Sequence, residues 1–170
     1  MKMLLAMNPT VDINYILQSL GLTILFVGLI GFERQRRNKI AGLTTHLLVA
    51  IGASGLTIGQ QIMVQDSIMF IEEMMANNPE ALQYMDIPIQ RQRVVAQIVS
   101  GIGFLGTGAI LKTNGYISGL TTASTLWISA IIGIIFGYGM YVLGISLSLM
   151  TLFVLTIIKN VIRLNIDEYH

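Results

Sequence analysis

The sequence predicts an all-α membrane protein, a polytopic helical bundle of about five transmembrane helices. Of its 170 residues, 54% are hydrophobic and only 11% are charged, whereas a soluble domain carries about 25% charged residues. The mean hydropathy is +0.71. No charged side chain lies between Lys112 and Lys159, a run of 46 residues. As one helix this run would be roughly 69 Å long, and the hydrocarbon core of a bilayer is about 30 Å thick. The run therefore contains two helices and a turn.

Long uncharged segments predict five spans within a single transmembrane domain covering residues 1–170. Asp12 precedes the first span and is expected to be its helix N-cap. The uncharged run divides near Gly137–Gly139, because two glycines weaken a helix. Residues 1–7 lack a cleavage-site pattern, so we expect an uncleaved first span, and we expect no soluble C-terminal domain. The predicted spans are residues 14–32, 43–63, 94–111, 120–137 and 140–158.

The connection at residues 64–93 is expected to be external and helical. Ser67–Met75 repeats apolar residues at helical spacing, and the run Asn77–Pro79 is typical of a helix end. A second short helix is expected over residues 80–85. We interpret the connection as a lid on the bundle or the lipid surface; a segment that binds a partner protein is the alternative.

Lysine and arginine residues predict the orientation, because cytoplasmic loops carry more of them. The connection at residues 33–42 holds four, and alternation then places seven on the same side against three on the other. We therefore expect a multi-pass protein of the bacterial inner membrane with its N-terminus outside and its C-terminus inside.

The chain contains a partial internal repeat, which predicts two hairpins of the same orientation. Ala41–Thr45 (AGLTT) is matched by Ser118–Thr122 (SGLTT), 77 residues later, and both precede a predicted span. The paired threonines can cap these helices. Alternatively, two helix N-termini that lie together on one side would attract an anion. The four threonines are Thr44, Thr45, Thr121 and Thr122.

Glycines are frequent in the predicted spans. Gly101–Gly106 matches the dinucleotide-binding pattern G-x-G-x-x-G, but it lies inside an apolar span without the preceding strand that this pattern requires. Small residues instead allow membrane helices to approach closely. We expect helix packing at Gly101, Gly103, Gly106, Gly108, Gly133 and Gly137, and at the pair Gly55 and Gly59.

Polar residues near the membrane form two predicted clusters. Glu33 is expected to accept hydrogen bonds from free N–H groups at one or the other GLTT helix start and to hold the hairpins together, while Arg34 or Arg37 presents the cluster to a partner or an anion. Gln97 is expected to face the bundle, because an amide in hydrocarbon needs a partner. The cytoplasmic cluster comprises Glu33, Arg34, Arg37, Thr44, Thr45, His46, Thr121 and Thr122, and the external cluster comprises Arg93 and Gln97.

Few residues suit catalysis or metal binding. The chain has no cysteine and two histidines, His46 and His170. No paired carboxylates, Ser/His/Asp set or metal-ligand spacing occurs. His46 can be a proton relay, a ligand or a capped interfacial side chain. The net charge of +1 does not favour nucleic-acid binding. We therefore expect no enzymatic activity and no cofactor.

Four successive motifs resemble those of the MgtC/SapB family of bacterial inner-membrane proteins. They are Gly31–Gln35, Ala41–His46, Arg93–Gly108 and Gly119–Trp127. The resemblance implies about five spans and a link to magnesium limitation, acid tolerance and virulence. It also implies a regulator of other membrane proteins, ATP synthase included, rather than a magnesium transporter.

Two functional classes follow from the sequence. The first is a non-enzymatic regulator in the lipid bilayer that binds other membrane proteins, or copies of itself, through faces of small residues. The second is a transporter or channel for a small ion or anion, built on the hairpin repeat. An ion path needs ionisable groups at mid-depth, and the five spans have no charge there, which favours the regulator.

Overall fold

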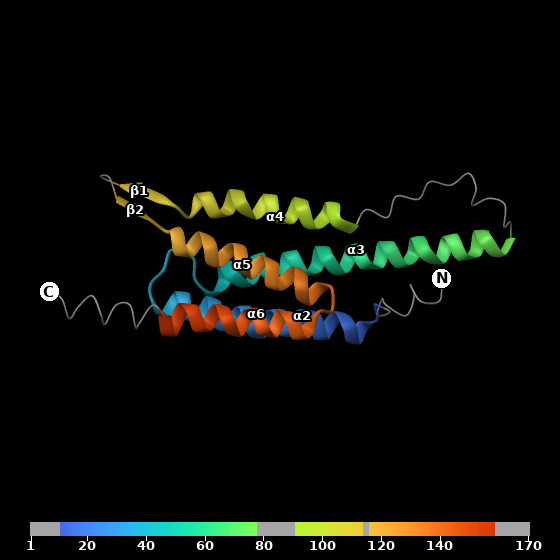
Figure 1. Cartoon of the computed structure of the whole chain (residues 1–170), viewed down its shortest axis with the longest axis horizontal. Coiled ribbons are helices and arrows are strands. Elements are labelled where there is room, and N and C mark those ends of the chain that lie inside the picture. The colour runs from blue at the N-terminus through green and yellow to red at the C-terminus, as the bar shows by residue number, and fades with distance from the viewer. Residues whose placement is uncertain (1–10, 78–90, 114–115, 159–170) are drawn as a thin grey trace.

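The computed structural model describes residues 11–77, 91–113 and 116–158, and over these residues the fold is the predicted all-α bundle with one short β-hairpin (Figure 1). The possible helix at residues 80–85 lies outside the described residues. The helices are α2 (Ile13–Arg36), α3 (Leu43–Asn77), α4 (Arg91–Gly108), α5 (Leu120–Gly137) and α6 (Tyr141–Phe153), which continues into a π-helical turn, η2 (Val154–Ile158). The strands are β1 (Leu111–Thr113) and β2 (Tyr116–Ser118).

The helices alternate in direction. In Figure 1, α3 and α5 begin at the left-hand end and run to the right, while α2, α4 and α6 run back to the left. The two GLTT segments open α3 at Leu43 and α5 at Leu120, so both helix starts lie at one end of the bundle. The repeat therefore corresponds to two hairpins of the same direction, one made of α2 and α3 and the other of α4 and α5.

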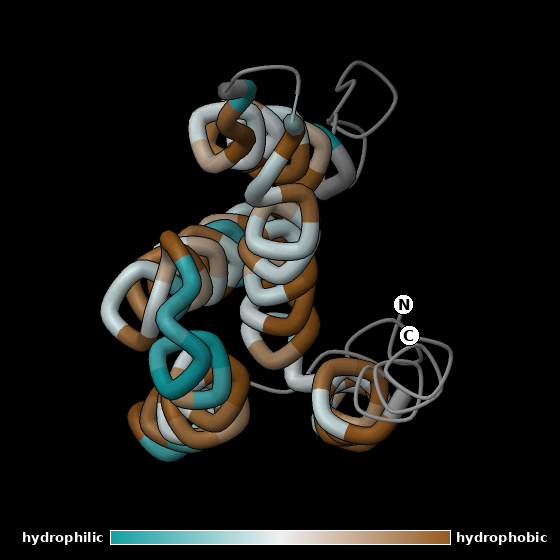
Figure 2. The backbone as a smooth tube through the Cα atoms, turned by 90° about the vertical axis from the view of Figure 1, so that its left-hand side faces the viewer, coloured by the Kyte–Doolittle hydropathy of each residue, from teal (hydrophilic) through white to brown (hydrophobic). Residues whose placement is uncertain are grey.

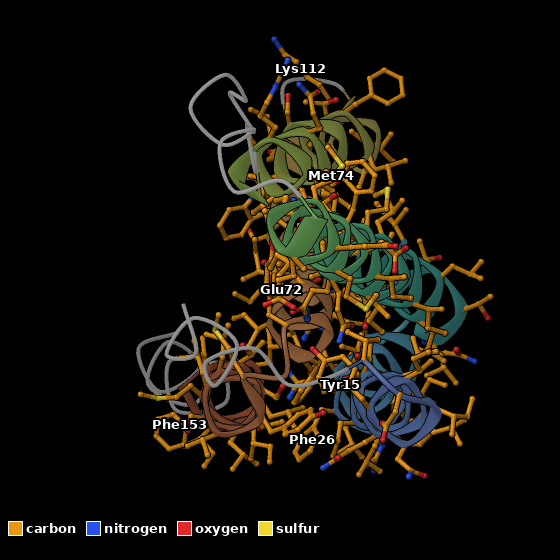
Figure 3. The ribbon with its side chains drawn as sticks, turned by 90° about the vertical axis from the view of Figure 1, so that its right-hand side faces the viewer. Tyr15, Phe26, Glu72, Met74, Lys112 and Phe153 are labelled. Carbon is orange, nitrogen blue, oxygen red and sulfur yellow. The ribbon has the colours of Figure 1, made fainter. Side chains whose placement is uncertain are left out.

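Helix α5 is the central helix, because it packs against α2, α3, α4 and α6. Its Ile132 and Phe136 join Val27, Ala50 and Leu155 in the main apolar core. The aromatic rings of Phe26 and Phe136 lie 5.9 Å apart between centroids, and Figure 3 shows Phe26 between α2 and α6. A second, smaller core joins α5 to α3 and α4 through Ala53, Ile102, Ala130 and Ile134.

Among the described residues, three helices are long and apolar enough to cross a membrane: α2, α5, and α3 over Leu43–Met74. The apolar stretch Tyr141–Ile157 is shorter. Helix α4, which holds the third predicted span, does not meet these limits, because Arg91, Arg93 and Gln97 fall in its first two turns. Many large apolar side chains are exposed on the described helices, among them Phe104 and Val142, as expected of a surface that faces lipid.

Helix α3 is longer than the second predicted span. Its 35 residues measure roughly 52 Å at about 1.5 Å per residue, and Figure 1 shows its end projecting past the rest of the bundle. The helix predicted over Ser67–Met75 is present, but its residues continue α3 without a break after the predicted second span. No glycine or proline lies between Met63 and Ser67 to end the helix.

A polar network joins α2, α3 and the α5–α6 turn at the end opposite the GLTT starts. The predicted cap is present, since Tyr15 N–H donates to Asp12 Oδ1 at 2.7 Å. The Tyr15 hydroxyl donates to the Gly137 carbonyl at 2.7 Å, and Figure 3 shows Tyr15 facing the neighbouring helices. Gln61 Nε2 donates to the Tyr15 hydroxyl and to the same carbonyl. The chain turns at Tyr138 and Gly139, where the sequence predicts it.

The β-hairpin between α4 and α5 was not predicted. Its antiparallel register pairs Leu111 with Ser118 and Thr113 with Tyr116, so the predicted third span ends too late, because α4 stops at Gly108. The hairpin leads to Gly119, which adopts φ +86°. A side chain at Gly119 would overlap the Ala109 carbonyl, so this position requires glycine.

The predicted glycine contacts separate into two groups. Gly133 and Gly137 face the backbone of α3 at Ala50 and Ser54, and Gly106 lies near Ala123. Around the other predicted packing glycines no atom lies within 4 Å of the position that a Cβ would take, so their predicted role in packing is wrong for contacts within this chain. These are Gly55, Gly59, Gly101, Gly103 and Gly108.

Candidate functional site

The charged end of the bundle is where α2 and α4 end and where α3 and α5 begin (Figure 1). Figure 2 views the molecule from this end and shows a strongly hydrophilic stretch at the end of α2. This stretch corresponds to residues 33–39, with sequence ERQRRNK. We call the polar residues here that are buried or ion-paired the basal cluster: Glu33, Arg34, Arg37, His46, Thr122 and Thr125.

Two arginines of the basal cluster share one carboxylate. Arg34 Nε donates to Glu33 Oε2, and Arg37 Nε lies 2.6 Å from Glu33 Oε1. The Arg34 side chain is completely buried, while those of Glu33 and Arg37 are 12% and 28% exposed. Two guanidinium groups and one carboxylate leave a net charge of +1 in this group.

Most of the Arg34 guanidinium has no hydrogen-bond acceptor. Its Nη1 and Nη2 atoms are buried and make no hydrogen bond within the described part of the chain. A buried charged donor without a partner is costly, because it has lost its hydration without gaining an acceptor. Arg34 is the largest fully buried side chain among the described residues.

His46 joins α3 to α5 within the basal cluster. The ring is fully buried, its Nδ1 lies 2.7 Å from the Gly42 carbonyl, and its Nε2 lies 3.1 Å from the Thr125 hydroxyl. Because a carbonyl only accepts, Nδ1 carries a proton. Thr125 Oγ1 is also 2.9 Å from the Thr122 carbonyl, so the Thr125 hydroxyl lies between the His46 ring and this carbonyl.

The caps of α3 and α5 differ from those predicted. At the start of α3, the Leu43 N–H donates to Gln35 Oε1 at 3.2 Å, so the acceptor there is Gln35. At α5 the N-cap is Gly119, which has no side-chain cap. The predictions that Glu33 accepts from these helix starts and that the paired threonines cap them are therefore wrong. Both helices begin at the leucine before the threonine pair, which places the threonines inside the first turn.

Not every predicted residue joins the basal cluster. Thr44, Thr45 and Thr121 are exposed, whereas Thr122 is buried. Sequence reasoning missed Gln35 and Thr125. Thr125 lies one turn after Thr122 and so falls on the same face of α5, a spacing that could have identified it.

The predicted external pair lies on α4, far along the helix from the basal cluster. Arg93 and Gln97 are both exposed, so the expectation that Gln97 faces the bundle is wrong. One face of α4 packs on α3 and α5 through Ile102, Gly106 and the nearby Ala109, and Gln97 lies away from that face.

The described part of the chain contains no group of three His, Cys, Asp or Glu side chains placed to hold a metal ion. A groove of about 420 Å³ runs between α3 and α4 and is lined by apolar and small residues, Gly52, Ala53 and Gly101 among them. A second groove, of about 510 Å³, lies near the charged end beside Ala41 and Thr45.

Comparison with known proteins places these features in one family. The chain is 40% identical over 144 residues to a protein of Escherichia coli K12 named "Putative magnesium transporter YhiD", covering 84% of this chain and 60% of that protein. It is 42% identical over 113 residues to Protein MgtC of Brucella abortus, covering 66% and 38%. It is 41% identical over 127 residues to Protein MgtC of Salmonella typhimurium, covering 75% and 45%.

The chain thus spans between about two fifths and three fifths of the length of these relatives. No solved structure matches it. A sequence profile described as the MgtC family matches residues 20–164, a range that includes α3, α4, α5, α6 and the basal cluster. This match and the 40% identity to YhiD confirm the resemblance seen in the motifs, and the chain belongs to the MgtC family.

Proposed function

We propose that this protein acts in magnesium homeostasis as a non-enzymatic subunit that packs against other membrane proteins and regulates them. We further propose that it resides in the bacterial inner membrane with the basal cluster on the cytoplasmic side. Family membership and the names of the relatives support the link to magnesium. The basic residues at the end of α2 support the orientation.

The outward face of α4 carries the proposal. This face holds Gln97, Ser100, Gly101, Phe104 and Gly108, all exposed, and Phe104 is 81% exposed. Amide and hydroxyl groups are unfavourable next to lipid tails, and bare glycines allow another helix to approach closely. Helix α4 is also not among the three helices apolar enough to span alone. A helix of another membrane protein, packed on this face, would cover these groups.

Substitution of Gly101 by leucine tests this proposal. No atom lies within 4 Å of a Cβ at Gly101, so the fold should be kept while the approach of a partner helix is blocked. We expect the variant to accumulate in the membrane at the normal level. In a host that lacks its own copy of the gene, we expect it to fail to restore growth at limiting magnesium.

The matched control is Gly21→Leu on α2, where again no atom lies within 4 Å and the glycine is exposed. This control should support growth like the unaltered protein. Equal growth of the Gly101→Leu and control strains would contradict a docking role for α4.

Transport is the competing function, since one relative carries the name "Putative magnesium transporter YhiD". The purified protein in liposomes that contain a magnesium-sensitive dye separates the two. The regulatory proposal predicts the same magnesium entry as in empty liposomes. Entry that depends on the protein would favour transport instead.

A further inference from the structure

We propose that Arg34 and the first turn of α5 bind a phosphate group at the charged end of the bundle. The inference does not rest on the regulatory function proposed above. Arg34 is fully buried, and its Nη1 and Nη2 atoms are two charged donors without an acceptor. Only its Nε is used, in the bond to Glu33. These two nitrogens form one edge of the planar guanidinium, the edge that binds two oxygens of one anion.

The contacts of α2 with α3 place Arg34 at the same position along the bundle axis as the first turns of α3 and α5. Arg34 follows Gly31 by three residues and therefore lies on the same face of α2, one turn nearer the charged end. A Cβ at Gly31 would lie 2.9 Å from Leu43 Cα and 3.2 Å from His46 Cβ. The guanidinium and the His46 ring are near enough to interact electrostatically.

His46 connects α3 to α5 at this position along the bundle axis. Its ring contacts Thr125, and Thr122 lies one turn nearer the start of that helix. Both threonines are buried, with exposures of 3% and 2%. Arg34 and the first turn of α5 are thus linked through His46, which interacts with the Arg34 charge and contacts Thr125.

The first turn of α5 supplies backbone donors in the same region. The first hydrogen bond inside the helix joins Ala123 N–H to the Gly119 carbonyl at 2.9 Å. The N–H groups of Leu120, Thr121 and Thr122 precede this bond and have no acceptor within the helix. Gly119 has no side chain to accept from them. Such a helix start favours an anion through its free N–H groups and its dipole.

Charge balance also favours an anion. Glu33 neutralises only one of Arg34 and Arg37, which leaves one positive charge in this group. A tetrahedral phosphate can give two oxygens to Arg34 and another to the helix start, whereas a planar carboxylate has only two oxygens. The same chemistry belongs to inorganic phosphate and to the headgroup of an anionic phospholipid at the cytoplasmic surface.

Melting of the full chain in a neutral detergent tests the proposal in two arms. The first adds inorganic phosphate and compares it with chloride at equal ionic strength. The second adds phosphatidylglycerol and compares it with phosphatidylcholine. We expect a rise in melting temperature of at least about 5 °C at a hundredfold excess over the dissociation constant. A rise with phosphate that Arg34→Gln loses identifies the free anion as sufficient, and a rise with phosphatidylglycerol alone identifies the lipid headgroup.

Variants locate the site. Arg34→Gln removes both free donors and should weaken binding roughly tenfold or more. Arg34→Lys keeps the charge but loses the two-pronged geometry, and should also bind more weakly. The control Arg36→Gln removes an exposed charge two residues away and should bind as the unaltered protein does.

Two results would overturn the inference. One is that neither phosphate nor phosphatidylglycerol raises the melting temperature of the unaltered protein above its value with chloride or phosphatidylcholine. This result does not depend on whether any variant folds. The other is an equal loss of binding in Arg36→Gln and in Arg34→Gln or Arg34→Lys, which would show a general charge effect instead of a site.

Discussion

Replacing Gly133 by alanine is expected to lower the melting temperature of the purified protein by about 6–12 °C. A Cβ at this position would overlap the Ala50 carbonyl oxygen and lie 3.0 Å from the Ala50 carbonyl carbon. These atoms belong to the backbone of α3, so they cannot rotate away as a side chain can. Helices α3 and α5 would have to separate, at a cost of about 3 kcal/mol by the usual effect of overpacking.

The matched control is Gly103→Ala on α4. No atom lies within 4 Å of a Cβ there, and alanine is favoured over glycine inside a helix by roughly 0.5–1 kcal/mol. Its melting temperature should be unchanged or slightly raised. Equal losses in the two variants would contradict the close packing of α5 on α3.

Replacing Glu33 by glutamine is expected to destabilise the bundle by about 2–3 kcal/mol, or roughly 4–12 °C in melting temperature. The carboxylate is bonded to Arg34 Nε and lies 2.6 Å from Arg37 Nε. Glutamine has nearly the same shape but no charge, so the buried guanidinium of Arg34 would lose its counterion. Breaking a fully buried pair costs about 3–5 kcal/mol, and the 12% exposure of Glu33 reduces this value.

Glu73→Gln serves as the control for the loss of one carboxylate, because Glu73 is exposed on the far part of α3. It should melt within about 1 °C of the unaltered protein. If Glu33→Gln melted at the same temperature as this control, the basal ion pairs would contribute nothing to stability.

The sequence predicted the features that depend on local signals. Asp12 caps α2 because its side chain can accept from an N–H three residues later. The turn at Gly139 needs φ +72°, which glycine adopts readily. The two GLTT segments mark helix starts because each helix begins at the leucine after a glycine.

Features that depend on contacts between different helices of the chain are harder to predict. Glycine spacing shows where close contact is possible but not which face a helix presents, so Gly133 packs on α3 while Gly101 and Gly103 stay open. Gln35 and Glu33 are both acceptors near the start of α3, and only the path of residues 37–42 decides that Gln35 accepts from Leu43. The Asn114–Gly115 pair is a strong local signal for a β-hairpin turn. Because this pair lies between two predicted membrane spans, the sequence pattern does not predict strands there.

In the proposed orientation, the basal cluster lies at the cytoplasmic end of a membrane-spanning bundle and the far part of α3 lies outside. The sequence has no cysteine of its own, so single cysteines at Asn38 and at Glu73, both exposed, report on the two ends. A membrane-impermeant thiol reagent applied to intact spheroplasts should label Glu73→Cys and should label Asn38→Cys only after the membrane is broken. Labelling of Asn38→Cys in intact spheroplasts, with Glu73→Cys protected, would contradict this orientation.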